Sequence, residues 1–167
     1  MKENSIKLED IEILLNQQLQ DLYCLEMVSK DVLPKFKNAS SDEALKTTID
    51  AQCITLNANL KHILKLAEEA NIKLSNDTCS TLENIVLKSE SYLDKGPVND
   101  FGILSHIDRI NQYKTAVYNS AVRFAKALNY KKFYKELENI KNYTYNMNDR
   151  LARLVDNKSD ERLIENL

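Results

Sequence analysis

The chain has 167 residues, and its 23 Lys and Arg against 25 Asp and Glu give a net charge of −2. This balance provides no basic surface for nucleic acid, and no apolar run approaches the roughly 18 residues of a membrane span. We therefore expect neither a nucleic-acid partner nor a membrane anchor. Only two Gly and two Pro occur in the sequence. Because sheets joined by turns need more turn-forming residues, the composition predicts an all-α protein.

Apolar residues recur at spacings of three, four and seven in the first half of the chain, which is typical of amphipathic helices. The first helix is predicted over residues 7–37, with Pro34 near its end. The second helix is predicted over residues 42–70, and Ser40 with Glu43 fits a capping box at its start.

The second half of the chain predicts three further helices. A short helix over residues 79–93 ends before a Gly-Pro pair, and a long helix follows over residues 98–128. Asn129 ends this helix, and the fifth is predicted over residues 131–155. Four long helices with short connections predict an antiparallel four-helix bundle, with the short helix as the crossover.

The length is that of one domain, which we expect to span residues 1–167, with a core over about 7–155 and a fraying charged tail over 156–167. The N-terminus is polar and lacks the apolar run of a signal peptide. Three cysteines are present, an odd number without a CxxC pair. They are Cys24, Cys53 and Cys79. We therefore predict buried free thiols in a reducing cytoplasm.

Polar residues interrupt the apolar stripes of all four long helices. They are Gln18, Glu26, Gln52, Thr55, Asn59, Asn111, Lys114, Thr144 and Asn148. A polar layer at mid-height of a four-helix bundle is the arrangement that binds two iron or manganese ions. That chemistry requires about four Glu and two His, because hard cations need charged oxygen donors and imidazole. Amides and hydroxyls could complete a coordination sphere but could not hold an ion alone.

Several short motifs carry a family resemblance in their order and spacing. The run Asp21-Leu22-Tyr23-Cys24-Leu25-Glu26, followed by Leu33-Pro34-Lys35, is similar to a first-helix signature D-x-Y-x-A-E and L-P-K. Residues 96–100, Gly-Pro-Val-Asn-Asp, resemble the P-x-V-R-D that opens a later segment. Both patterns are typical of the ferritin-like family represented by the bacterial stress-associated YciF and YciE proteins. The resemblance covers about residues 10–155.

The resemblance implies a ferritin-like bundle with an additional short helix, a dimeric state and a di-metal centre. It retains one proposed metal ligand, Glu26. The other ligand positions fall on Gln52, Thr55, Asn111, Lys114 and, within about one turn, Thr144. With His and most carboxylates replaced, we expect no cofactor and no bound iron, manganese or zinc.

Glu26 can also be interpreted as a buried acid that is satisfied by a neighbouring side chain. An isolated buried carboxylate costs several kcal/mol, and a lysine on a neighbouring helix removes that cost. The resemblance implies that Glu26 and Lys114 lie on helices that both contribute to the metal layer. We therefore predict that Lys114 lies within hydrogen-bond or one-water reach of Glu26, with Gln52 or Asn111 completing the network. A residual metal ligand and a catalytic acid with a raised pKa are the alternatives.

These observations favour a non-enzymatic, metal-free ferritin-like protein that acts through its surface, as a homodimer or with a protein partner, in a stress response as the resemblance implies. One alternative is a metal-binding protein or oxidoreductase with an unrecognised site. The other is a carrier of a small apolar ligand in the bundle centre. His62 and His106 fall outside the ligand positions, and we predict both at the surface or the rim of the bundle.

Overall fold

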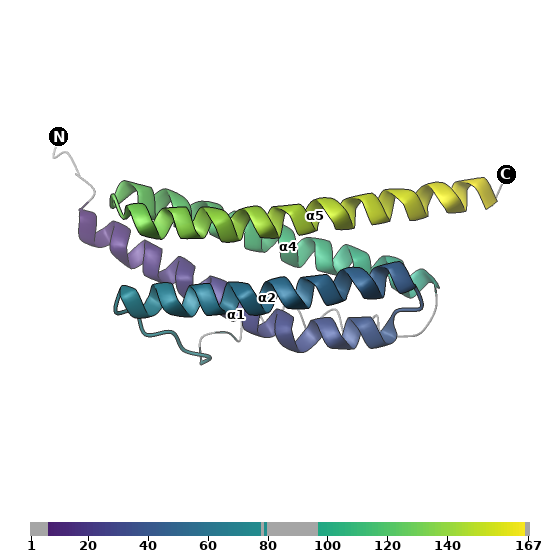
Figure 1. Cartoon of the computed structure of the whole chain (residues 1–167), viewed down its shortest axis with the longest axis horizontal. Helices are drawn as coiled ribbons and strands as arrows, with labels where there is room; N and C mark the ends of the chain where they lie inside the picture. Colours follow the sequence, from purple (N-terminus) through teal and green to yellow (C-terminus); the bar gives the residue numbers. More distant parts are fainter. Residues whose placement is uncertain (1–6, 78, 80–96, 166–167) are drawn as a thin grey trace, which may run out of the picture.

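Four long helices, packed side by side along one axis, make up the computed structural model, which describes residues 7–77, 79 and 97–165 (Figure 1). They are α1 (Leu8–Ala39), α2 (Glu43–Glu69), α4 (Pro97–Ala127) and α5 (Lys131–Glu165). Within the described residues no strand occurs, which confirms the predicted all-α bundle. The short helix predicted over residues 79–93 lies outside the described part of the chain except for its first residue.

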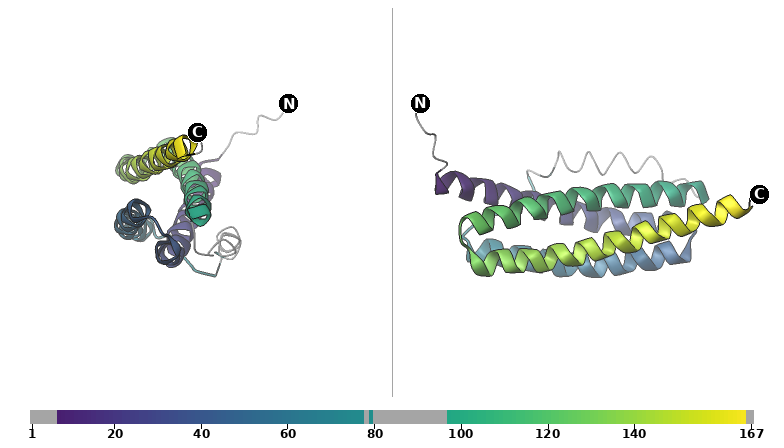
Figure 2. Two further views of the ribbon diagram at one scale, coloured as in Figure 1. Left: turned by 90° about the vertical axis from the view of Figure 1, so that its right-hand side faces the viewer. Right: turned by 90° about the horizontal axis from the view of Figure 1, so that it is seen from above.

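The helices occupy the corners of a square when the bundle is viewed from its end (Figure 2). Helix α1 packs on α2 and α4, and α5 packs on the same two helices from the opposite corner. Helices α2 and α4 lie on a diagonal and run in the same direction, so every adjoining pair is antiparallel (Figure 1). None of the four combines the length and hydrophobicity needed to cross a bilayer.

The connection between α1 and α2 is closed by side-chain hydrogen bonds. Asp42 is the N-cap of α2 and accepts from the Leu45 backbone N–H at 2.7 Å. The predicted capping box starting at Ser40 is therefore wrong. Ser40 is instead the C-cap of α1, and its hydroxyl donates to the Asp100 carboxylate at 2.7 Å. Asp100 also accepts from the Ser41 backbone N–H at 3.0 Å, so it ties the first turn of α4 to this connection.

The remaining helix boundaries follow the sequence closely, with one exception. Asn129 adopts a positive φ of 58°, and this left-handed residue ends α4 as predicted. Helix α5 was predicted to end at residue 155, but it continues to Glu165. Its last turns extend past the other helices at that end of the bundle (Figures 1 and 2). The composition of these turns is charged but contains no Gly or Pro, so helix propensity permits the extension.

Two apolar clusters fill the two ends of the bundle. One joins the start of α1, the ends of α2 and α4 and the start of α5, and it includes Leu19, Leu22 and Leu137. The other joins the end of α1, the starts of α2 and α4 and the middle of α5, and it includes Phe36 and Leu45. A set of buried polar residues that includes Glu26, Gln52, Lys114 and Thr144 lies between these clusters.

A disulfide joins Cys24 of α1 to Cys79, with a Cα–Cα distance of 5.1 Å. The prediction of free thiols is wrong for these two cysteines, and the inference of a reducing cytoplasm no longer has their support. Cys53 is the free cysteine of the set, and it is half-buried. Gln20 of α1 also binds the segment that follows α2, because its side-chain amide exchanges two hydrogen bonds with the Ser75 backbone at 2.6 and 2.9 Å.

Candidate functional site: the buried polar layer

The polar layer at mid-height of the bundle contains all six positions singled out from the sequence. Five are buried, with the following exposed fractions: Glu26 0%, Gln52 6%, Asn111 7%, Lys114 5% and Thr144 5%. Thr55 is half-buried, and its hydroxyl donates to the Ala51 carbonyl one turn earlier at 3.1 Å. The antiparallel packing brings one or more of these residues from each helix to the same height.

Glu26 and Lys114 form a buried ion pair across the α1–α4 contact. The Lys114 Nζ donates to Glu26 Oε2 at 2.7 Å, and the side chains are only 6% and 1% exposed. This confirms the pair predicted from the sequence. Burial of either charge alone would cost several kcal/mol, so each residue makes the other tolerable at this position.

The second oxygen of Glu26 is held by neutral donors. Asn59 of α2 donates to Glu26 Oε1 at 3.3 Å, and the Tyr118 hydroxyl of α4 donates to the same oxygen at 3.2 Å. Asn59 also approaches the Thr144 hydroxyl of α5 at 3.5 Å. The prediction that Gln52 or Asn111 completes the network is therefore wrong for the hydrogen bonds to Glu26, because Asn59 and Tyr118 donate them instead.

Tyr118 remains a hydrogen-bond donor at neutral pH. Burial raises its pKa well above the ordinary value, and the negative Glu26 carboxylate raises it further. Sequence reasoning missed this role. The signal that could have found it is spacing: Tyr118 follows Lys114 by four residues, which places both side chains on one face of the helix.

A small cavity of about 30 Å³ lies at the centre of the layer. Its polar lining includes Glu26, Gln52, Asn59, Asn111, Lys114 and Thr144. Gln18 and Asn148, which also interrupt the apolar stripes, do not line it. Sites for cofactors and drug-sized ligands have volumes of roughly 300–1,000 Å³, so this centre is too small for such a ligand. The alternative of a carrier with its ligand in the bundle centre has no support from this cavity.

Comparison with known proteins identifies the group to which this fold belongs. A family model described as "Domain of unknown function (DUF892)" matches residues 10–164. The chain belongs to this family. The E. coli stress protein YciF has a similar structure, with a TM-score of 0.83 and 23% identity over 90% of this chain and 97% of YciF. YcfI from Rhodopseudomonas palustris gives 0.77 and 18% over 91% of this chain and 97% of its own. No curated protein matches the sequence significantly.

The DUF892 match and the YciF-like fold confirm the resemblance read from the sequence motifs. At these identities the structural likeness establishes the arrangement of helices, whereas the chemistry of the layer has to be read from this chain's own residues.

The layer of this DUF892 protein does not fit a di-metal centre. A pair of hard divalent cations needs several carboxylates and imidazoles. Among the described residues that line the layer, Glu26 is the single carboxylate, and both of its oxygens accept hydrogen bonds. The Lys114 ammonium lies 2.7 Å from one of these oxygens, where it would repel a cation. Within the described residues, no three His, Cys, Asp or Glu side chains gather as metal ligands would.

The two histidines lie away from the layer. His62 is partly exposed, and its Nδ1 contacts the Glu136 carboxylate of α5, so its predicted surface location is confirmed. His106 is buried, and its ring meets the edge of Phe36 with centroids 5.9 Å apart. The predicted rim location is therefore wrong for His106. The reason is packing: His106 lies three residues after the buried Ile103 and four before the buried Ile110, so it falls on the same inward face of α4.

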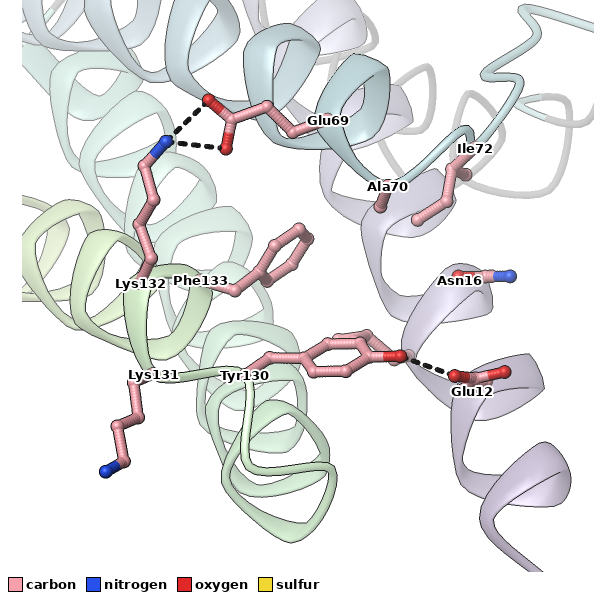
Figure 3. A pocket seen from close by; sticks show the side chains of 10 residues that line it. Glu12, Asn16, Glu69, Ala70, Ile72, Tyr130, Lys131, Lys132 and Phe133 are labelled. Atoms are coloured by element: carbon pink, nitrogen blue, oxygen red, sulfur yellow. Dashed lines mark hydrogen bonds and ion pairs between the residues drawn. The ribbon is translucent and has the colours of Figure 1, made fainter.

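A surface hollow of about 440 Å³ lies at the end of the bundle where α5 begins (Figure 3). The Tyr130 hydroxyl points across it to Glu12 of α1, and Lys132 pairs with Glu69 of α2 at 2.8 Å. Lys131 points away from both pairs (Figure 3). Because these groups bind one another across the hollow, they join three helices at this end of the bundle, and we assign no chemistry to them.

Proposed function

We propose that this protein is a metal-independent, non-enzymatic member of the ferritin-like proteins, in which an ion pair takes the place of the metal centre. The Glu26–Lys114 contact of 2.7 Å is the observation that carries the proposal. An ammonium supplies the positive charge that a bridging cation would otherwise provide, and it does so without a vacant coordination position. A layer of this kind has no open site for activating oxygen or water.

In this proposal the protein acts through its outer surface, as a homodimer or with a protein partner. The E. coli relative is described as a stress protein, and we extend that role to this chain. The buried layer then serves to fix the relative positions of the helices, whose outer faces form this surface. Sedimentation measurements over a range of concentrations test the homodimer, which should be the dominant species at micromolar concentrations.

Metal analysis tests the central part of the proposal. The protein is purified without chelators, incubated with Fe²⁺, Mn²⁺ or Zn²⁺, desalted and measured for metal per chain. We expect far less than one metal per chain and no oxidation of Fe²⁺ above the rate in buffer. One or more metals per chain, lost in Glu26→Ala, would contradict the proposal.

A variant with restored ligands provides the matched control. The changes Thr55→Glu, Asn111→Glu and Lys114→Glu return carboxylates to positions where the family resemblance places them. If this variant folds, it should retain more metal than the natural sequence, because it removes the ammonium and adds three charged oxygen ligands.

A further inference from the structure

Two buried amide donors of the polar layer have no acceptor among the residues that the structure describes. They are the Nε2 group of Gln52 and the Nδ2 group of Asn111. Both side chains are more than nine-tenths buried, at 6% and 7% exposure, and both line the cavity beside Glu26 and Lys114. Buried polar groups nearly always have a hydrogen-bond partner, and an unpaired donor carries its full desolvation cost.

The cavity has the size and the lining of a site for a very small ligand. Its volume is about 30 Å³. A polar cavity of roughly 10–15 Å³ is enough for one water molecule, provided that two to four polar partners surround it. Gln52, Asn111 and Lys114 provide N–H donors here, and Glu26 provides an acceptor.

The charges of the layer decide between water and an anion. Lys114 and Glu26 already neutralise each other at 2.7 Å. A chloride in the same cavity would add an uncompensated negative charge beside the Glu26 carboxylate in a low-dielectric interior. A water molecule adds no net charge. It can accept from both amides and donate to the carboxylate, which an anion cannot do.

We propose that this cavity is a specific site for one ordered water molecule, which accepts N–H bonds from Gln52 and Asn111 and donates to Glu26. The site rests on the metal-free layer proposed above. It brings the two amides into the ion-pair network through a bridging water. A groove between α2 and α5 adjoins the cavity, because Thr55 and Asn59 line both.

Crystals of the full chain grown in bromide provide the test, with diffraction data collected at the bromine edge and at the edges of iron, manganese and zinc. We expect one peak within hydrogen-bond distance of the Gln52 and Asn111 side-chain amides, without anomalous signal at any edge. A bromide signal or an empty cavity overturns the water site and leaves the proposed function intact. A transition-metal signal overturns both.

Two variants separate the site from general disturbance of the core. Asn111→Leu removes one donor and fills the cavity, so the peak should be lost. Leu137→Met is the matched control, because Leu137 is fully buried, carries no polar atom and does not line the cavity; it should keep the peak. Oxygen-17 relaxation dispersion in solution should show one long-lived internal water fewer in the first variant than in the natural protein and the control. Equal counts in all three overturn the proposal.

Discussion

Lys114 is the residue whose charge makes a buried Glu26 tolerable. Lys114→Met should lower the free energy of unfolding by about 3–5 kcal/mol, because it leaves an uncompensated carboxylate in the core. Denaturant unfolding measures the loss, and Glu26→Leu combined with Lys114→Met should recover most of it. Lys37→Met is the matched control: its pair with Asp50 is exposed, and its loss should stay below about 1 kcal/mol. A similarly small loss for Lys114→Met would contradict the proposed role.

Tyr118 makes the stability of the protein depend on alkaline pH. Its pKa is raised by burial and by Glu26, so the folded state keeps a proton that the unfolded state releases near pH 10. The unfolded state then binds fewer protons, and the free energy of unfolding falls as the pH rises above about 10. Tyr118→Phe should weaken this fall and should cost about 1.5–3 kcal/mol at pH 7, since it removes a hydrogen bond to a charged group.

The control for Tyr118 is Tyr143→Phe, because Tyr143 is 65% exposed and lies outside the layer. Unfolding free energies are compared at intervals between pH 7 and pH 11. The control should follow the natural protein throughout. If the unfolding free energy of Tyr118→Phe also follows that of the natural protein above pH 10, the buried hydroxyl does not cause the loss of stability at alkaline pH.

At the residue scale, the sequence predicts the helix face that a side chain occupies, but it predicts less well how far along the bundle axis that side chain lies. Helical spacing placed Glu26 and Lys114 on inward faces, the family resemblance placed both at the metal layer, and their opposite charges then predicted a contact. The same spacing could not decide whether Gln52 or Asn59 of α2 reaches Glu26. They lie on one face but about two turns apart, and the axial offset between helices comes from packing across the whole bundle.

Helix ends show where local sequence and tertiary contacts compete. Ser40 and Asp42 are both good N-cap residues, and a capping box favoured Ser40. In the folded chain the Ser40 hydroxyl binds Asp100 from α4, and Asp42 caps α2 instead. Asp100 is distant in sequence, so its effect could not be predicted from local patterns.

The Cys24–Cys79 disulfide links helix α1 to the segment that follows α2. It spans 55 residues, and the loss of chain entropy on closing a loop of this length predicts stabilisation of about 4 kcal/mol. Cys24→Ala with Cys79→Ala should lower the free energy of unfolding by roughly 2–5 kcal/mol, and a reductant should have a similar effect on the natural protein. The sequence did not predict this pair. The number of cysteines is odd, and their spacing does not show which two of them meet in the folded chain.

Peptide mapping and denaturant unfolding provide the measurements for the disulfide. A linked peptide containing Cys24 and Cys79 should appear without reductant and disappear with it. Cys53→Ser is the control, because Cys53 is the free thiol and its loss should leave the linked peptide in place. A protein that contains three free thiols after aerobic purification would contradict the structure at this point.

At the scale of the whole molecule, the bundle consists of two apolar clusters separated by one polar layer. The four-helix architecture could be predicted from periodicity and from the scarcity of Gly and Pro, because those features determine helices and their connections. The length of α5 could not be predicted in this way. Its charged final turns contain no residue that ends a helix, and they extend beyond the other three helices.

The polar layer should fix the alignment of the helices at a cost in stability. Glu26→Leu, Gln52→Leu, Asn59→Leu, Asn111→Leu and Lys114→Met together would join the two apolar clusters into one core. Such replacements are often neutral or stabilising by about 1–4 kcal/mol, so denaturant unfolding should show no loss of stability.

A uniform apolar stripe, however, allows the helices to slide or to associate in other ways. We therefore expect broadened methyl signals in NMR spectra and mixed oligomers in sedimentation. The variant with only Glu26→Leu and Lys114→Met keeps three buried amides and should remain well ordered. Sharp, dispersed spectra from the fully apolar variant would show that close packing alone aligns this bundle.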